Sequence, residues 1–230
     1  MFDATSKSRL RHLRQHCPAE PDPTAARDSL GPVPPAPTRT EALHKIGVTL
    51  PLELAEQIER GEIPEPATVI VAAGTLGTAA GLALGFAIAG LKTRVKAVRI
   101  TARIVTNERV LARLIRGAED LLHRAGTDID VAANAIDRVE LLHDHIGRGY
   151  GLETEEGKRA VTHFDSHGIL LDPTYTAKAA AAFMARAADL PKPVLFWQTL
   201  SAAEPPGAGD AVLAALPKPF RDYILSTGAQ

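Results

Sequence analysis

Hydrophobic positions concentrate in one stretch, residues 69–91, which carries no charge. It opens with three consecutive β-branched residues (Val-Ile-Val), a pattern typical of a strand buried on both faces of a parallel sheet. Small and hydroxyl residues follow at 74–78 and predict a tight turn, and the alanine-rich segment 79–89 favours a helix. A strand, a glycine-containing loop and a helix in this order direct backbone N–H groups and a helix N-terminus toward an anion. The stretch therefore predicts a phosphate site at 74–78, where Thr75 and Thr78 can add hydroxyl donors.

Two other interpretations of this stretch stay open, and a third fails. Its 23 uncharged residues are enough to cross a bilayer, and Gly77, Gly81 and Gly85 repeat the small-residue spacing of packed membrane helices. The glycines could instead permit close packing of a helix on a sheet without any ligand. A dinucleotide fold would need Gly-x-Gly-x-x-Gly after the strand, whereas here the spacing is Gly74-x-x-Gly77. The dinucleotide fingerprint is therefore absent.

Periodicity in the remaining chain predicts strands that alternate with helices. We expect helices over residues 51–60, 107–124, 154–164 and 174–188, strands over 94–100, 139–143 and 194–199, and a short strand or lead-in over 168–172. Such alternation indicates an α/β protein with an open, mostly parallel sheet and helices on both faces. In such sheets ligands bind at the carboxyl ends of the strands.

The first 40 residues differ in composition from the rest. They begin with a basic segment and then place seven of the 17 prolines between residues 18 and 37, so we expect a disordered tail at 1–40 and one α/β domain at 41–230. The formal net charge is −1, which gives no general indication of a nucleic-acid or membrane partner. The single cysteine, Cys17, excludes an intramolecular disulfide framework and suggests a reducing, cytoplasmic location.

Two histidine pairs have the spacing of metal ligands. They are His143 with His145, and His163 with His167, which would lie one turn apart on a helix. No motif links the two pairs, so we interpret them as surface or loop histidines and predict no metal site.

Four segments resemble the pyridoxal-phosphate enzymes of the tryptophan-synthase-β fold type, in particular the aminocyclopropane-carboxylate deaminase and D-cysteine desulfhydrase branch. In chain order they are ELAEQIERGEIPEP (53–66), AAGTLGTAAGL (72–82), GRGYGLET (147–154) and GILLDPTYTAKA (168–179). The last is the most specific, since that family usually has Gly-Ile-Leu-Leu-Asp-Pro-Val-Tyr-Thr-Gly-Lys-Ala there. The resemblance covers roughly residues 50–200 and implies an incomplete large domain of the tryptophan-synthase-β type.

The resemblance also implies residue roles. The cofactor phosphate would be held by main-chain groups of the cofactor loop, Gly74, Thr75, Leu76, Gly77 and Thr78. Tyr175 would be the active-site phenol, which can donate to a substrate carboxylate, or exchange a proton at the substrate's carbon if the site lowers its pKa. Thr199 would contact the cofactor ring.

The chain departs from the family pattern at several of these positions. Leu76 replaces a glycine of the cofactor loop, Ala177 replaces a glycine of the tyrosine motif, and Gln-Thr-Leu-Ser at 198–201 replaces His-Thr-Gly-Gly. The family's Schiff-base lysine belongs to an N-terminal half with no counterpart here. Lys7 only faintly matches its motif, and Lys178 corresponds to a second lysine of the family.

These observations leave two expectations for function. The first is a pyridoxal-phosphate-dependent lyase or deaminase that acts on a small amino acid, working as a homo-oligomer or with a complementing chain. The second is an inactive relative that binds a phosphate ligand or a partner.

Overall fold

The computed structural model describes residues 49–124, 126–200 and 214–227. The chain divides into two compact units, with the boundary between Leu200 and Ser201. In the first unit the elements are α3 (Thr49–Glu59), β1 (Thr68–Ala73), α4 (Gly77–Ile88), β2 (Arg94–Arg99), α5 (Glu108–Arg124), α6 (Ala132–Asp137), β3 (Val139–Leu142), α7 (Glu155–Asp165), α8 (Thr176–Arg186) and β4 (Val194–Trp197). The described part of the second unit contains α10 (Lys218–Thr227).

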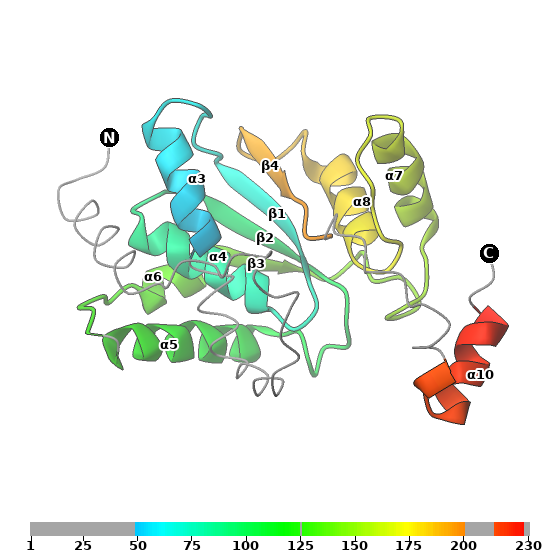
Figure 1. Cartoon of the computed structure of the whole chain (residues 1–230). Coiled ribbons are helices and arrows are strands. Elements are labelled where there is room, and N and C mark those ends of the chain that lie inside the picture. Colours follow the sequence, from blue (N-terminus) through cyan, green and yellow to red (C-terminus); the bar gives the residue numbers. More distant parts are fainter. Residues whose placement is uncertain (1–48, 125, 201–213, 228–230) are drawn as a thin grey trace. The chain divides into compact units, whose positions relative to one another are not determined.

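The four described strands form one parallel sheet in the order β3-β2-β1-β4 (Figure 1). β1 is central: Val69 pairs with Val95 of β2 on one side and with Leu195 of β4 on the other. Since all pairs are parallel, the carboxyl ends of the strands share one edge of the sheet. The predicted α/β class is confirmed.

Side chains of β1 alternate between two separate cores. Val69, Val71 and Ala73 pack in the cluster that includes α3, α4, α5 and α6, whereas Ile70 and Ala72 pack in the cluster with α8. All six residues of the strand are buried, which explains the apolar run without alternation. Helices therefore cover both faces of the sheet, as predicted; α7 packs in turn on α8 (Figure 1).

The helix α4 is buried on every side. It packs against α3, α5, α6 and strands β1 and β2, and every residue from Ala79 to Ile88 is buried. A helix that is apolar all round belongs in a core or in a membrane. Here neighbouring helices and the sheet cover it, and the 69–91 stretch divides into β1, a loop and α4. Among the described residues, no helix has the length and apolarity needed to cross a membrane.

Most predicted elements agree with the structure within one or two residues. The segment 168–172 is a lead-in without regular secondary structure, and the short helix α6 has no predicted counterpart. The proposed tail at 1–40, with Lys7 and Cys17, lies outside the described residues. Within the second unit, α10 carries an ion pair between Lys218 and Asp222, one turn apart.

Candidate functional site

The loop between β1 and α4 has an unusual backbone at Leu76. This residue adopts φ 68° and ψ 1°, in the left-handed region, and no other described non-glycine residue has a positive φ. Its side chain is only 1% exposed and belongs to the main core. The backbone conformation is thus one that suits the family's glycine, and the leucine side chain is directed into the protein.

Hydrogen bonds hold the start of this loop. The carbonyl of Gly74 accepts from the hydroxyls of both Thr101 and Thr106, which lie in the segment after β2. Thr106 is fully buried. These two hydrogen bonds therefore fix the start of the loop to the segment that follows β2.

The first turn of α4 meets the requirements of an anion site. Leu76 is its N-cap residue and makes no capping hydrogen bond through its side chain. Helix N-termini leave backbone N–H groups unpaired within the helix and carry the positive end of the helix dipole. Gly77 and Thr78 at the start of α4 are half-buried. This end of the helix can therefore bind a phosphate without a basic side chain.

Tyr175 lies directly against Gly74. A Cβ atom built on Gly74 would be 2.8 Å from the Cε1 atom and 2.8 Å from the hydroxyl oxygen of Tyr175. Contacts that short are not tolerated, so only glycine fits while the tyrosine occupies this position. The structure thus brings together two of the predicted site residues, about 100 residues apart in sequence, at the carboxyl edge of the sheet.

Asp172 fixes the backbone at Tyr175. One carboxylate oxygen accepts from the N–H groups of Thr174 (3.0 Å) and Tyr175 (2.6 Å), and the other accepts from Thr176 N–H (3.0 Å) and the Thr176 hydroxyl (2.7 Å). Partial burial opposes ionisation of this carboxyl, but the hydrogen bonds outweigh it and hold its pKa below the usual value. Asp172 therefore caps α8 as a carboxylate.

Tyr150 is the second aromatic residue at the site. Its ring meets that of Tyr175 edge-on, with centroids 5.8 Å apart and an interplanar angle of 86°. Burial, followed by a hydrogen bond with Tyr150, raises the pKa of Tyr175 to about 12. Proton exchange by Tyr175 would require a lowered pKa, as expected from the resemblance. The shift is upward, so the phenol stays protonated at neutral pH and can donate a hydrogen bond.

Thr199 follows β4 at the same edge of the sheet. It lies two residues beyond the last pair of β4 with β1, Trp197 with Val71. The Thr199 side chain is exposed, and its backbone N–H donates to the side-chain oxygen of Gln198 (2.9 Å). Thr75 is also exposed. Both threonines are therefore accessible to solvent near the carboxyl edge of the sheet.

Lys178 lies one turn after Tyr175 on α8 and is fully buried. Its Nζ donates to the carbonyls of Ile146 (3.0 Å) and Gly149 (2.9 Å). Burial lowers the pKa of this amine. The amine is thus engaged by the loop that carries Tyr150.

Three features of the site were not predicted from the sequence. They are the ring of Tyr150, the carboxylate of Asp172 that caps α8, and the contact of Lys178 with the loop that carries Tyr150. All three lie within the motifs at 147–154 and 168–179, so the signal was present in the motifs but without an assigned role.

The histidine pairs make contacts within the protein. His143 accepts from Arg99 (2.9 Å), and His167 contacts the carbonyl of His163 (2.9 Å). Among the described residues, no three His, Cys, Asp or Glu side chains gather in a way that could hold a metal.

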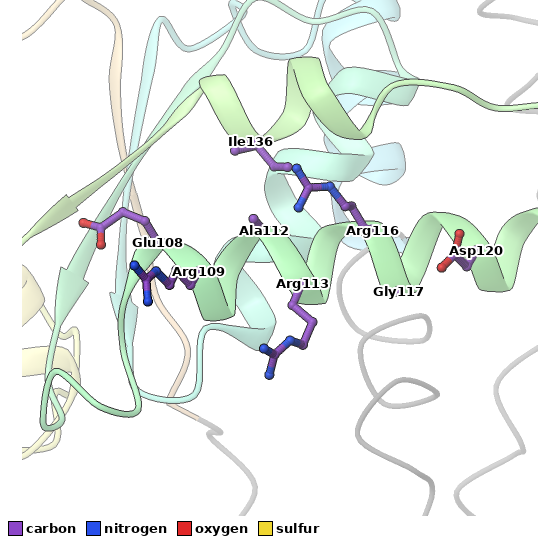
Figure 2. Close-up of a pocket in the computed structure, with 8 residues that line it drawn as sticks. All are labelled: Glu108, Arg109, Ala112, Arg113, Arg116, Gly117, Asp120 and Ile136. Atoms are coloured by element: carbon purple, nitrogen blue, oxygen red, sulfur yellow. The ribbon is translucent and has the colours of Figure 1, made fainter.

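A separate hollow of about 690 Å³ lies along α5 next to α6. Arg109, Arg113 and Arg116 line it, with Glu108 and Asp120 at its two ends (Figure 2). Figure 2 shows that Arg116 points toward Ile136 while Arg113 points away from it. The arginines diverge, so this hollow does not assemble convergent donors, and the tyrosine-lined edge is the better candidate site.

Comparison with known proteins agrees with this geometry. Residues 14–199 match the family model described as "Pyridoxal-phosphate dependent enzyme". D-cysteine desulfhydrase of Klebsiella pneumoniae (strain 342) is 34% identical over 147 residues, which is 63% of this chain and 42% of the relative. D-cysteine desulfhydrase of Serratia proteamaculans (strain 568) is 29% identical over the same length and shares.

A solved structure is also similar. The crystal structure of an ACC deaminase homologue superposes with a TM-score of 0.50 at 29% identity and covers 64% of this chain and 45% of its own. The chain thus spans less than half the length of the relatives it matches. These matches confirm the resemblance to the deaminase and desulfhydrase branch.

The residues present fit the phosphate end of the family's cofactor. The fixed glycine loop, the α4 N-terminus and the donor phenol of Tyr175 lie together at one edge of the sheet. The matching segment extends over most of the chain, from residue 14 to residue 199. Fold, loop geometry and sequence match agree, and the chain belongs to the pyridoxal-phosphate dependent enzyme family.

Proposed function

We propose that this chain is the cofactor-phosphate domain of an enzyme that releases ammonia, or sulfide as well, from a small amino acid and leaves a keto acid. The observation that carries the proposal is the contact between Tyr175 and Gly74, since it brings a phenol next to the loop that we propose binds the phosphate. Similarity to the D-cysteine desulfhydrases and to the ACC deaminase homologue supports this substrate class.

Each residue of the proposed site has a physical role. Backbone N–H groups from Gly74 to Thr78 hold the phosphate, and the hydroxyls of Thr75 and Thr78 add donors. Bound pyridoxal phosphate supplies the electron-withdrawing ring that stabilises a carbanion at the substrate. The protonated Tyr175 phenol donates a hydrogen bond to the substrate carboxylate, and Thr199 contacts the ring from the end of β4.

Trp197 offers a direct binding assay. It is the single tryptophan of the chain and ends β4, so pyridoxal phosphate at the carboxyl edge should quench its fluorescence. Gly74→Ala forces Tyr175 to move, because the new Cβ would lie 2.8 Å from the ring. We expect this variant to bind at least tenfold more weakly. Gly117→Ala on α5 is the matched control, because its Cβ would meet nothing within 4 Å.

Further arms separate the possible outcomes. Pyridoxal without the phosphate should bind weakly, and inorganic phosphate should compete with the cofactor. Keto acid and sulfide released from D-cysteine, and keto acid from aminocyclopropane-carboxylate, measure turnover. Equal affinities of the two glycine variants would refute the proposed site. Wild-type chain that binds the cofactor without turnover would refute catalysis by this chain without a complementing chain.

A second function has one observation in its favour. The Lys178 amine is engaged by two carbonyls, so this lysine is not free to anchor a cofactor. Non-covalent binding of a phosphate ligand by an inactive relative is the corresponding alternative. Binding that stays fully reversible, with no keto acid released, would favour it.

We also propose that the chain works in the cytoplasm, either as a homo-oligomer or with a complementing chain. The strands β3 and β4 are the two edges of the described sheet, and Ile104 and Leu170 expose 85% and 68% of their surface. Such edges and apolar side chains favour association. A clean monomer in sedimentation velocity would contradict the self-association.

A further inference from the structure

The segment 146–151, here called the tyrosine loop, has a backbone that needs support. Gly147, Gly149 and Gly151 all have positive φ values, of 66°, 152° and 76°. Glycine restricts the backbone least, so a segment with three glycines within five positions has many accessible conformations. Something must therefore select the single conformation that presents Tyr150 to Tyr175.

Lys178 is placed to make that selection. Its Nζ bonds two carbonyls of the tyrosine loop three residues apart, Ile146 at 3.0 Å and Gly149 at 2.9 Å. Gly149 directly precedes Tyr150. The lysine side chain is 0% exposed, so water does not compete for these bonds. Among the described residues, no carboxylate forms an ion pair with Lys178, so the two carbonyls of the tyrosine loop hold its amine.

Tyr175 and Lys178, at the start of α8, both contact the tyrosine loop. Tyr175 and Lys178 are three residues apart and lie on one face of α8 at its start. Tyr175 meets the Tyr150 ring edge-on at 5.8 Å, while Lys178 holds the carbonyl beside Tyr150. Moving the tyrosine loop away from Lys178 would therefore also separate the two phenols.

We propose that Lys178 is a positioning residue: its buried amine clamps the tyrosine loop and so sets the edge-on contact between the rings of Tyr150 and Tyr175. The inference rests on the proposed function in taking Tyr175 as the active-site phenol. The test of this inference needs no cofactor. The role of Lys178 can therefore be refuted while the proposed function holds, and the proposed function can be refuted while the role of Lys178 holds.

The test reads the Tyr175 pKa in the full chain by NMR with ring-labelled tyrosine. In Lys178→Met we expect the Tyr175 pKa to fall below its raised value of about 12, because the contact with Tyr150, which adds to the effect of burial, is lost. Lys158→Met, at an exposed lysine of α7, is the matched control and should leave it unchanged. An unchanged Tyr175 pKa in folded Lys178→Met would overturn the proposal.

A double-mutant cycle separates positioning from a general loss of packing. The single variant Tyr150→Phe should lower the Tyr175 pKa. Adding Lys178→Met to that variant should lower the pKa little further, since both substitutions act through the contact between the two rings. Independent, additive shifts would mean that Lys178 acts by another route.

A measurement on the unmodified chain keeps the test decisive if Lys178→Met does not fold. Nitrogen-15 spectra of the lysine ammonium should show a slowly exchanging signal correlated across hydrogen bonds with the carbonyl carbons of Ile146 and Gly149. A rapidly exchanging ammonium without these correlations would refute the clamp.

Discussion

Leu76 offers a test of the loop in which two effects of known size compete. In the left-handed region a residue with a Cβ costs roughly 1–2 kcal/mol that glycine avoids, while glycine loses roughly 0.5–1 kcal/mol more backbone entropy on folding. Leu76 adopts φ 68°, so Leu76→Gly should be more stable than Leu76→Ala by about 0.5–1 kcal/mol.

Both variants should nevertheless be less stable than the wild type. Leu76 is 1% exposed, and truncation of a buried leucine to alanine costs about 2–5 kcal/mol. Subtracting the relief of strain leaves Leu76→Gly about 1–4 kcal/mol below the wild type. Burial therefore outweighs backbone strain, which explains how a leucine persists where the family has glycine.

The assay is urea unfolding followed by far-ultraviolet circular dichroism, with the free energies compared at equal m-values. Leu84, fully buried in the middle of α4, is the matched control. There glycine should be less stable than alanine by about 1 kcal/mol, the reverse of the order at Leu76. If glycine is also the less stable substitution at position 76, the backbone there is not left-handed and the reasoning is wrong.

Two further predictions concern helix starts beside the site. Thr154 caps α7 by accepting from Gly157 N–H at 3.0 Å, so Thr154→Ala should lower the free energy of unfolding by about 1 kcal/mol, whereas Thr154→Ser should keep the cap; equal losses would contradict this. Asp172 has a lowered pKa, so it adds stability above its unfolded-state value near 4 that is lost as pH falls through the folded value. Asp172→Asn should therefore be less stable at pH 7 and show a flatter acid unfolding curve, and an unchanged pH dependence would contradict the cap.

The sequence was sufficient to predict the sheet because β1 and α4 carry extreme patterns. The β-branched start of β1 is buried on both faces, and α4 is apolar all round because five elements surround it. The lead-in at 168–172 was ambiguous, because its apolar run is short and Asp172 uses its carboxylate to start α8 instead. The helix α6 is only six residues long, too short for periodicity to detect.

Site chemistry was less predictable than site location. Motif spacing led to Gly74 and Tyr175, and the fold brings them into contact. The pKa of Tyr175 depends on burial and on Tyr150, 25 residues away, and neither can be read from the local sequence. The direction of that shift, and the engagement of Lys178 by the tyrosine loop, required three-dimensional contacts.

The departure at Leu76 does not by itself argue against phosphate binding. A loop binds an anion through its backbone N–H groups, so the relevant question is whether the backbone keeps its conformation. Leu76 retains a left-handed backbone with its side chain buried in the core, and the Gly74 carbonyl is held by two threonine hydroxyls. The backbone of the proposed anion site is therefore preorganised despite the substitution. What separates an active enzyme from a phosphate binder is then the source of the anchoring amine, because Lys178 already serves the tyrosine loop.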